Sequence, residues 1–157
     1  EQPHLILQGT PATFRSLLTA RWRDDGDAED PNSTQKQLTL ICGGEAFPPA
    51  LAPPLLKRTA RVWNAYGPTE TTIWSAAYRL TEEEKISEAS SIPLGSPLFN
   101  TQLFLAEAEA EAEATQGETD TSHLEGDLLI GGQGLALGYF RRPELTTERY
   151  VQRGEIL

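Results

Sequence analysis

The sequence predicts an α/β protein with a mostly parallel sheet and helices, followed by a small β-rich part. Up to residue 90, short apolar runs alternate with helix-like segments, a pattern that favours a parallel sheet. After residue 90 the apolar runs are short and interrupted by glycines, which is typical of a small β-rich subdomain. We therefore expect two parts, 1–90 and 91–157, with a low-complexity acidic connector at about 106–123.

Three short apolar runs in the first part predict strands, at 4–8, 38–42 and 61–65. A further apolar run, "TIWSAAY", covers 72–78. In the second part, the runs at 101–106, 127–132 and 135–140 predict three more strands.

Helices are predicted between the first strands and near the end of the chain. Thr10 and Pro11 have the residue types of an N-cap and a first helical position. Apolar residues then recur at helical spacing and are expected to face a core: Phe14, Leu17, Leu18 and Trp22. The segment "PPALAPPLLKR" begins like a helix, but Pro53 and Pro54 require that helix to break or restart. "RPELTTERYV" predicts a short final helix.

Charge and composition exclude several classes of function. With 13 basic and 23 acidic residues, the net charge of −10 argues against binding to a nucleic-acid backbone. The acidic runs within 24–30 and 107–127 are predicted to be solvated loops. No apolar run is long enough to cross a membrane. The single cysteine excludes a disulfide within the chain and fits a reducing compartment, so we expect a cytoplasmic location. Since the chain has no methionine and starts at Glu1, we expect it to be a piece of a longer polypeptide.

The stretch "NAYGPTETTIW", residues 64–74, concentrates polar and aromatic groups just after a predicted strand. Ligands of open α/β sheets bind beyond the carboxyl ends of the strands. Thr69 can donate a hydrogen bond to a phosphate oxygen, and Glu70 offers the oxygen ligand that Mg²⁺ prefers. Tyr66 can lie against a flat base whose polar edge meets Asn64. The same residues also suit an ordinary turn with a core aromatic and a surface carboxylate, and the residue types alone leave both interpretations open.

This stretch resembles the nucleotide-binding core motif of amino-acid adenylation domains in nonribosomal peptide synthetases, members of the adenylate-forming, AMP-binding superfamily. Four further segments resemble family motifs in the same order: "LQGTPATFRSLL", "LICGGEAFPPAL", "IPLGSPLFNTQLFL" and "EGDLLIGGQGLALGYFRRPELTTERYV". The five matches cover most of the chain apart from the two acidic stretches. The resemblance implies an internal fragment of the large N-terminal adenylation subdomain, followed by part of the small β-rich one.

The resemblance also implies a reaction. Family members activate an amino acid with ATP, giving aminoacyl-AMP and pyrophosphate, and the aminoacyl group then passes to the phosphopantetheine thiol of a peptidyl carrier domain. By the resemblance, Glu70 is the Mg²⁺ ligand and Thr69 contacts phosphate, so these two residues are the expected catalytic pair. The expected ATP/AMP-binding residues are Gly43, Gly44, Glu45, Asn64, Ala65, Tyr66, Gly67 and Thr69.

The amino-acid pocket is implied in the same way. Its expected lining residues are Gln8, Leu40, Cys42, Ala65, Ile73 and Trp74. An indole at the pocket floor occupies the volume that a large side chain needs, and the set resembles family members that take glycine. Glycine is therefore the expected substrate, with a small residue such as alanine or cysteine as the next alternative. Cys42 and Ala65 depart from those members, which usually have glycine and leucine there.

Other departures bear on activity. The family's phosphate loop "TSGSTGxPKG", its "TGD" motif and its C-terminal lysine do not occur among the 157 residues. Leu137 stands where the family usually has arginine. We therefore expect the 157 residues alone not to form an adenylate. Three interpretations remain: a segment of an adenylation domain, a segment of a related acyl-CoA synthetase, or a noncatalytic relic or interaction fragment.

Overall fold

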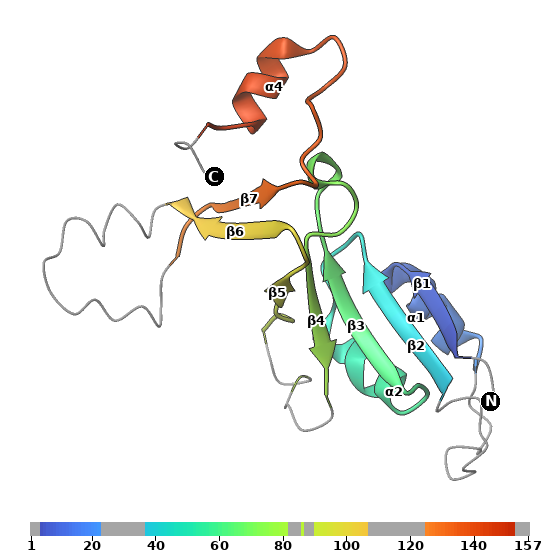
Figure 1. Cartoon of the computed structure of the whole chain (residues 1–157). Coiled ribbons are helices and arrows are strands. Elements are labelled where there is room, and N and C mark those ends of the chain that lie inside the picture. Colours follow the sequence, from blue (N-terminus) through green and yellow to red (C-terminus); the bar gives the residue numbers. More distant parts are fainter. Residues whose placement is uncertain (1–3, 23–36, 82–85, 87–89, 107–124, 153–157) are drawn as a thin grey trace, which may run out of the picture.

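The computed structural model describes residues 4–22, 37–81, 86, 90–106 and 125–152. The acidic run at 24–30 and the predicted connector beyond residue 106 lie outside the described residues. The elements follow one another along the chain (Figure 1) as β1 (Leu5–Gly9), α1 (Pro11–Thr19), β2 (Leu38–Gly43), the 3-10 turn η3 (Pro49–Leu51), α2 (Ala52–Leu56), β3 (Arg61–Tyr66), the 3-10 turn η4 (Thr69–Thr71), β4 (Ala76–Leu80), β5 (Ser96–Pro97), β6 (Thr101–Leu105), β7 (Leu128–Gly132) and α4 (Pro143–Arg149).

The larger sheet has the strand order β1-β2-β3-β4-β5. Strands β1, β2 and β3 are parallel, with Leu7 beside Leu40 and Leu40 beside Val62. Strand β4 runs antiparallel to β3, because the short connection at 67–75 cannot make the crossover that a parallel neighbour needs. Strands β6 and β7 form a separate antiparallel pair. The predicted mostly parallel α/β sheet with a small β part is therefore confirmed.

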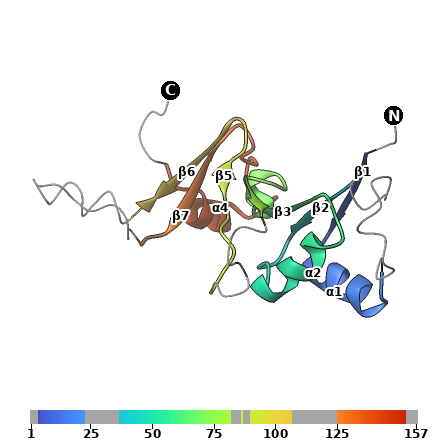
Figure 2. The ribbon, with the colours of Figure 1, turned by 90° about the horizontal axis from the view of Figure 1, so that it is seen from below.

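One face of the larger sheet is covered by helices. Figure 2 shows α1 and α2 together on the same side of the sheet. Alternate strand residues point to that side and form the core with Phe14 of α1 and Leu55 of α2. None of the described helices covers the opposite face of the sheet (Figure 2).

The predicted helices form, with local differences. Thr10 caps α1, because its Oγ1 accepts a hydrogen bond from the Thr13 amide at 3.3 Å, and Pro11 is the first helical residue. Trp22 lies beyond the end of α1 but still packs against the core. Pro53 and Pro54 fall in the first turn of α2, where a missing amide proton is tolerated, so the helix restarts as expected.

The predicted strand at 135–140 is wrong. These described residues form an irregular segment, because the Ala136 amide donates to the carbonyl of Glu70 at 2.8 Å instead of to a neighbouring strand. Gly138 has a positive φ of 130°, which also interrupts extended backbone. In the described part of the chain, no helix has the length and apolar character needed to span a bilayer.

Candidate functional site

The candidate site lies at the carboxyl ends of β2 and β3. In Figure 1 both arrows end at the edge of the sheet that faces β6 and β7. Gly43 ends β2 and Gly44 follows it, while the turn at 67–75 follows β3. The parallel pairing of these two strands brings Gly43 beside Ala65, so segments that are far apart in sequence meet at one edge. This is the position where open α/β sheets bind ligands.

The turn at 67–75 folds back tightly on the end of β3. The Ser75 amide donates to the Tyr66 carbonyl at 2.7 Å. A Cβ atom on Gly67 would lie 2.5 Å from the Ile73 carbonyl oxygen and 2.8 Å from the Trp74 Cα. Only glycine fits this close approach of two backbone segments, so the glycine of "YGP" has a steric cause.

Two β-branched residues of the turn adopt left-handed backbone angles. Thr72 has a φ of 60° and Ile73 a φ of 73°. Such a conformation costs about 1–2 kcal/mol for an L-residue. Hydrogen bonds hold it in place: Thr72 Oγ1 donates to the Gly134 carbonyl at 2.7 Å, and the hydroxyls of Thr71 and Ser75 lie 2.5 Å apart. Backbone strain of this kind concentrates at functional sites.

The Trp74 ring packs closely against Gly43. A Cβ atom on Gly43 would collide with the Trp74 ring and with the Ala65 carbonyl oxygen. The three residues Gly43, Ala65 and Trp74 therefore pack together, with the indole seated directly against the glycine. Any ligand side chain at this position has little room.

Leu40 and Cys42, which are also predicted pocket residues, lie apart from this group. Both are 0% exposed and pack in the core with Phe14 and Leu55, on the helix-covered face of the sheet. Because strand side chains alternate between faces, the residues of β2 that share the face of Ala65 are Ile41 and Gly43. Their role in the amino-acid pocket stays a prediction.

The other predicted pocket residues have different positions. Gln8 is exposed and pairs with Ile41, so it lies on the uncovered face. Ile73 is 64% exposed beside the partly buried Trp74. Gly44 and Glu45 are exposed after β2, and Gly44 has a positive φ of 85°.

Thr69 and Glu70 are adjacent, but they line different hollows. Thr69, Gly44 and Trp74 line a hollow of about 470 Å³. Glu70 and Tyr66 line a larger hollow of about 1160 Å³ against the small sheet, where Gln102 and Arg149 also lie. The structure thus brings Thr69 together with the glycine loop, and Glu70 with the C-terminal segment.

The carboxylate of Glu70 accepts a hydrogen bond from the hydroxyl of Tyr139. This bond is the main reason that the pKa of Glu70 lies below its ordinary value, and its own backbone amide and the charge of Arg149 act in the same direction. The same bond raises the pKa of Tyr139. Glu70 is therefore an ionised carboxylate at neutral pH. Neither its partner Tyr139 nor its contact with the C-terminal segment was predicted from sequence.

Asn64 is a buried residue with a structural partner. Its side-chain nitrogen donates a hydrogen bond to the Pro93 carbonyl at 2.8 Å. The residue as a whole is only 4% exposed. The side-chain nitrogen is thus committed, and the amide oxygen is the atom left to accept a hydrogen bond from a ligand.

The donor set fits a cation that arrives with a nucleotide. Among the described residues, no group of three or more His, Cys, Asp or Glu side chains could form a protein-only metal cage. Mg²⁺ is commonly held by one or two carboxylates together with substrate phosphates. The ionised Glu70 carboxylate has the chemistry of one such protein ligand.

Comparison with known proteins agrees with this geometry. Residues 3–140 match the family of AMP-binding enzymes. The dimodular nonribosomal peptide synthase of Bacillus subtilis (strain 168) is 38% identical over 146 residues, which is 93% of this chain and 5% of that protein. Gramicidin S synthase 1 of Brevibacillus brevis is 38% identical over 122 residues, 78% of this chain and 10% of that protein.

Solved structures show the same relationship. The four-domain nonribosomal peptide synthetase holo-AB3403, bound to AMP and glycine, has 39% identity and a TM-score of 0.69 over 96% of this chain and 10% of its own. An artificially fused adenylation–PCP di-domain from Klebsiella oxytoca has 25% identity and a TM-score of 0.64 over 94% of this chain and 26% of its own. The chain thus spans a tenth or less of the curated relatives named above. It belongs to the family of AMP-binding enzymes and corresponds to one segment of the adenylation domains of nonribosomal peptide synthetases.

Proposed function

We propose that this segment forms one wall of the site in which an amino acid is activated by ATP, within a longer nonribosomal peptide synthetase. An oxygen of the amino-acid carboxylate attacks the α-phosphorus, the bond to pyrophosphate breaks, and aminoacyl-AMP forms. The aminoacyl group then passes to the phosphopantetheine thiol of a peptidyl carrier domain. The observation that carries the proposal is the turn at 67–75 beyond the carboxyl end of β3, which is strained at Thr72 and Ile73 and carries Thr69 and the ionised Glu70 in η4.

Each residue of the turn has a role that follows from its chemistry. The Thr69 hydroxyl donates to a phosphate oxygen beside Gly44, whose lack of a side chain admits the ligand. Glu70 holds Mg²⁺, and that ion neutralises phosphate charge when bound. Tyr66 packs on the adenine ring, and the Asn64 amide oxygen accepts from its amino group. Since two anions must approach each other, alignment and charge neutralisation are the main tasks of the site.

We propose glycine as the substrate. The Trp74 indole fills the space in front of Gly43, which leaves little volume for a large substrate side chain. The synthetase holo-AB3403, which was crystallised with AMP and glycine, supports this choice. The fused adenylation–PCP protein supports a carrier domain as the partner.

Exchange of labelled pyrophosphate into ATP tests the proposal. Residues 4–152 replace the matching segment of holo-AB3403, and exchange is measured with each amino acid, with Glu70→Gln as the control. We expect glycine-dependent exchange that the control loses by a factor of about 100 or more. For the isolated 157 residues we propose no exchange.

The outcomes separate the alternatives. A chimera that binds AMP but exchanges only with a larger amino acid overturns the choice of glycine. Activity with fatty or aryl acids and coenzyme A favours an acyl-CoA synthetase. A chimera that binds AMP and exchanges with no acid favours a noncatalytic segment.

A further inference from the structure

The segment 134–150, which we call the C-terminal clamp, holds the turn that carries Glu70. The Ala136 amide donates to the Glu70 carbonyl at 2.8 Å, and Thr72 Oγ1 donates to the Gly134 carbonyl at 2.7 Å. A Cβ atom on Gly134 would lie 2.9 Å from the Thr71 carbonyl oxygen, so the two backbones are in close contact. The clamp therefore holds the backbone from the Glu70 carbonyl to Thr72.

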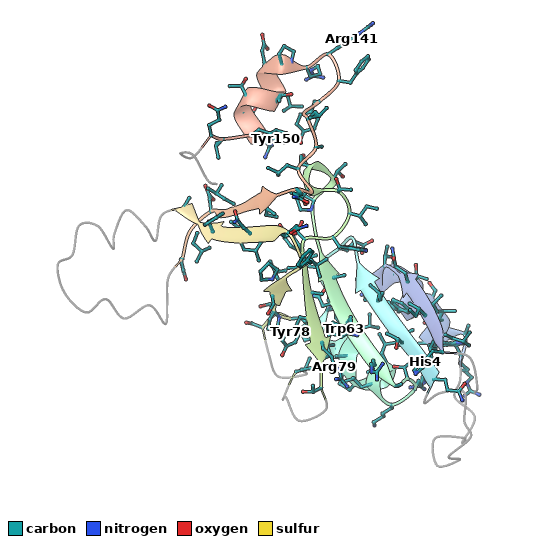
Figure 3. The ribbon with its side chains drawn as sticks, in the orientation of Figure 1. His4, Trp63, Tyr78, Arg79, Arg141 and Tyr150 are labelled. Atoms are coloured by element: carbon teal, nitrogen blue, oxygen red, sulfur yellow. The ribbon has the colours of Figure 1, made fainter. Side chains whose placement is uncertain are left out.

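Tyr139 extends this hold to the carboxylate itself. Its hydroxyl donates to Glu70 Oε1, whereas the Tyr150 hydroxyl reaches only the Glu70 carbonyl, at 3.5 Å. The two tyrosine rings pack edge to face with centroids 6.2 Å apart. In Figure 3, Tyr150 lies on the side of α4 that faces the small sheet, whereas Arg141 lies at the outer loop.

Helix α4 anchors Tyr139 in turn. The Tyr139 amide donates to Thr146 Oγ1 at 3.0 Å, and that hydroxyl donates to the Arg142 carbonyl at 3.0 Å. A side chain on Gly138 would collide with Thr146, since its Cβ would lie 2.6 Å from the Thr146 methyl carbon. The position of the phenol is thus set by packing and not by Glu70 alone.

We propose that Tyr139 is a positioning residue, which holds the Glu70 carboxylate in the orientation that serves a nucleotide-bound divalent cation. One hydrogen bond to Oε1 leaves Oε2 and further lone pairs for a cation. Carboxylates that bind metals are commonly oriented by such partners, whose loss weakens metal binding about 10- to 100-fold. The inference rests on the proposed function in assigning the cation to Glu70.

The test compares Tyr139→Phe with Tyr150→Phe. Both variants keep the ring pair and remove one hydroxyl, but only the first removes a bond to the carboxylate. Binding of Mn²⁺·ATP to the holo-AB3403 chimera described above is followed by electron paramagnetic resonance, and NMR couplings in the chain of 157 residues report the Glu70 side-chain rotamer. In Tyr139→Phe we expect the Glu70 side chain to exchange among several rotamers, which averages its NMR couplings. We also expect Mn²⁺·ATP binding to weaken about 10- to 100-fold. Tyr150→Phe should change neither.

A third variant tests the anchoring of Tyr139 by helix α4 without changing the phenol itself. Thr146→Val removes the hydroxyl that accepts from the Tyr139 amide and should weaken binding in the same direction as Tyr139→Phe. Equal effects of Tyr139→Phe and Tyr150→Phe on rotamer and affinity overturn the inference. If the chimera with the unaltered segment binds no Mn²⁺·ATP while Tyr139→Phe alone releases the Glu70 rotamer, the cation assignment of the proposed function fails and the positioning by Tyr139 is supported.

Discussion

The Tyr139 hydroxyl donates a hydrogen bond to the Glu70 carboxylate and so joins two segments that lie 69 positions apart in the sequence. This bond connects the turn after β3 with the irregular segment before α4. It lowers the pKa of Glu70 and raises the pKa of Tyr139. The strength of this hydrogen bond therefore depends on pH in both the acidic and the basic range.

We expect the stabilisation from this bond to be lost in acid and in strong base. Because the pKa of Glu70 is lowered from 4.5, its contribution is present above that value and disappears as pH falls through the lower native pKa. Because the pKa of Tyr139 is raised from 10.0, its contribution is present below that value and disappears as pH rises through the higher native pKa. The difference in melting temperature between wild type and Tyr139→Phe, followed across pH, checks this. A difference that stays constant through both windows contradicts it.

Substitution of Gly43 by alanine should destabilise the chain by about 1–3 kcal/mol, because the new methyl group meets the Trp74 ring and the Ala65 carbonyl. Urea unfolding measures the change. Gly131→Ala is the matched control, since its Cβ would have no atom nearer than 3.6 Å. Equal stability of the two variants would show that Trp74 moves aside without cost.

Substitution of Ile73 by glycine should stabilise the chain by about 1 kcal/mol. Ile73 is 64% exposed with a φ of 73°, so glycine relieves backbone strain while little apolar burial is lost. Val151→Gly, at a position that is also exposed but has no positive φ, should not stabilise. Thermal unfolding of both variants decides the point, and a loss of stability in Ile73→Gly would contradict it.

The buried thiol of Cys42 should be inert in the folded chain. Burial, with a smaller effect of Glu45, raises the pKa of Cys42 from 9.0 to about 12. Alkylation by iodoacetamide at pH 8 should therefore occur only after unfolding in urea. A native thiol that reacts as fast as the unfolded one would contradict the buried position.

The same thiol adds a pH dependence to folding. Between pH 9 and 12 the unfolded chain loses this proton and the native chain keeps it. The free energy of unfolding should fall by about 1.4 kcal/mol per pH unit more steeply in wild type than in Cys42→Ala. Parallel slopes for the two proteins would exclude the shift.

Much of the fold could be predicted from the order of apolar runs. The strands β1, β2 and β3 and the helix α1 lie close to their predicted ranges, because periodicity and the Thr10–Pro11 start are local signals. The antiparallel direction of β4 and the irregular backbone at 135–140 were not predicted. Both depend on partners distant in sequence: β4 on the return of the 67–75 turn, and 135–140 on the Glu70 carbonyl.

The sequence by itself determined the family, through motifs in a fixed order, and it pointed to the "YGPTE" turn as the candidate site. The tertiary structure decided which side chains of β2 share the face of Ala65, because alternation must be counted from a partner strand, and Gly43 beside Ala65 supplies that reference. It also decided that Tyr139 holds Glu70. No local pattern encodes that contact, since it exists only after the clamp has folded back across the turn.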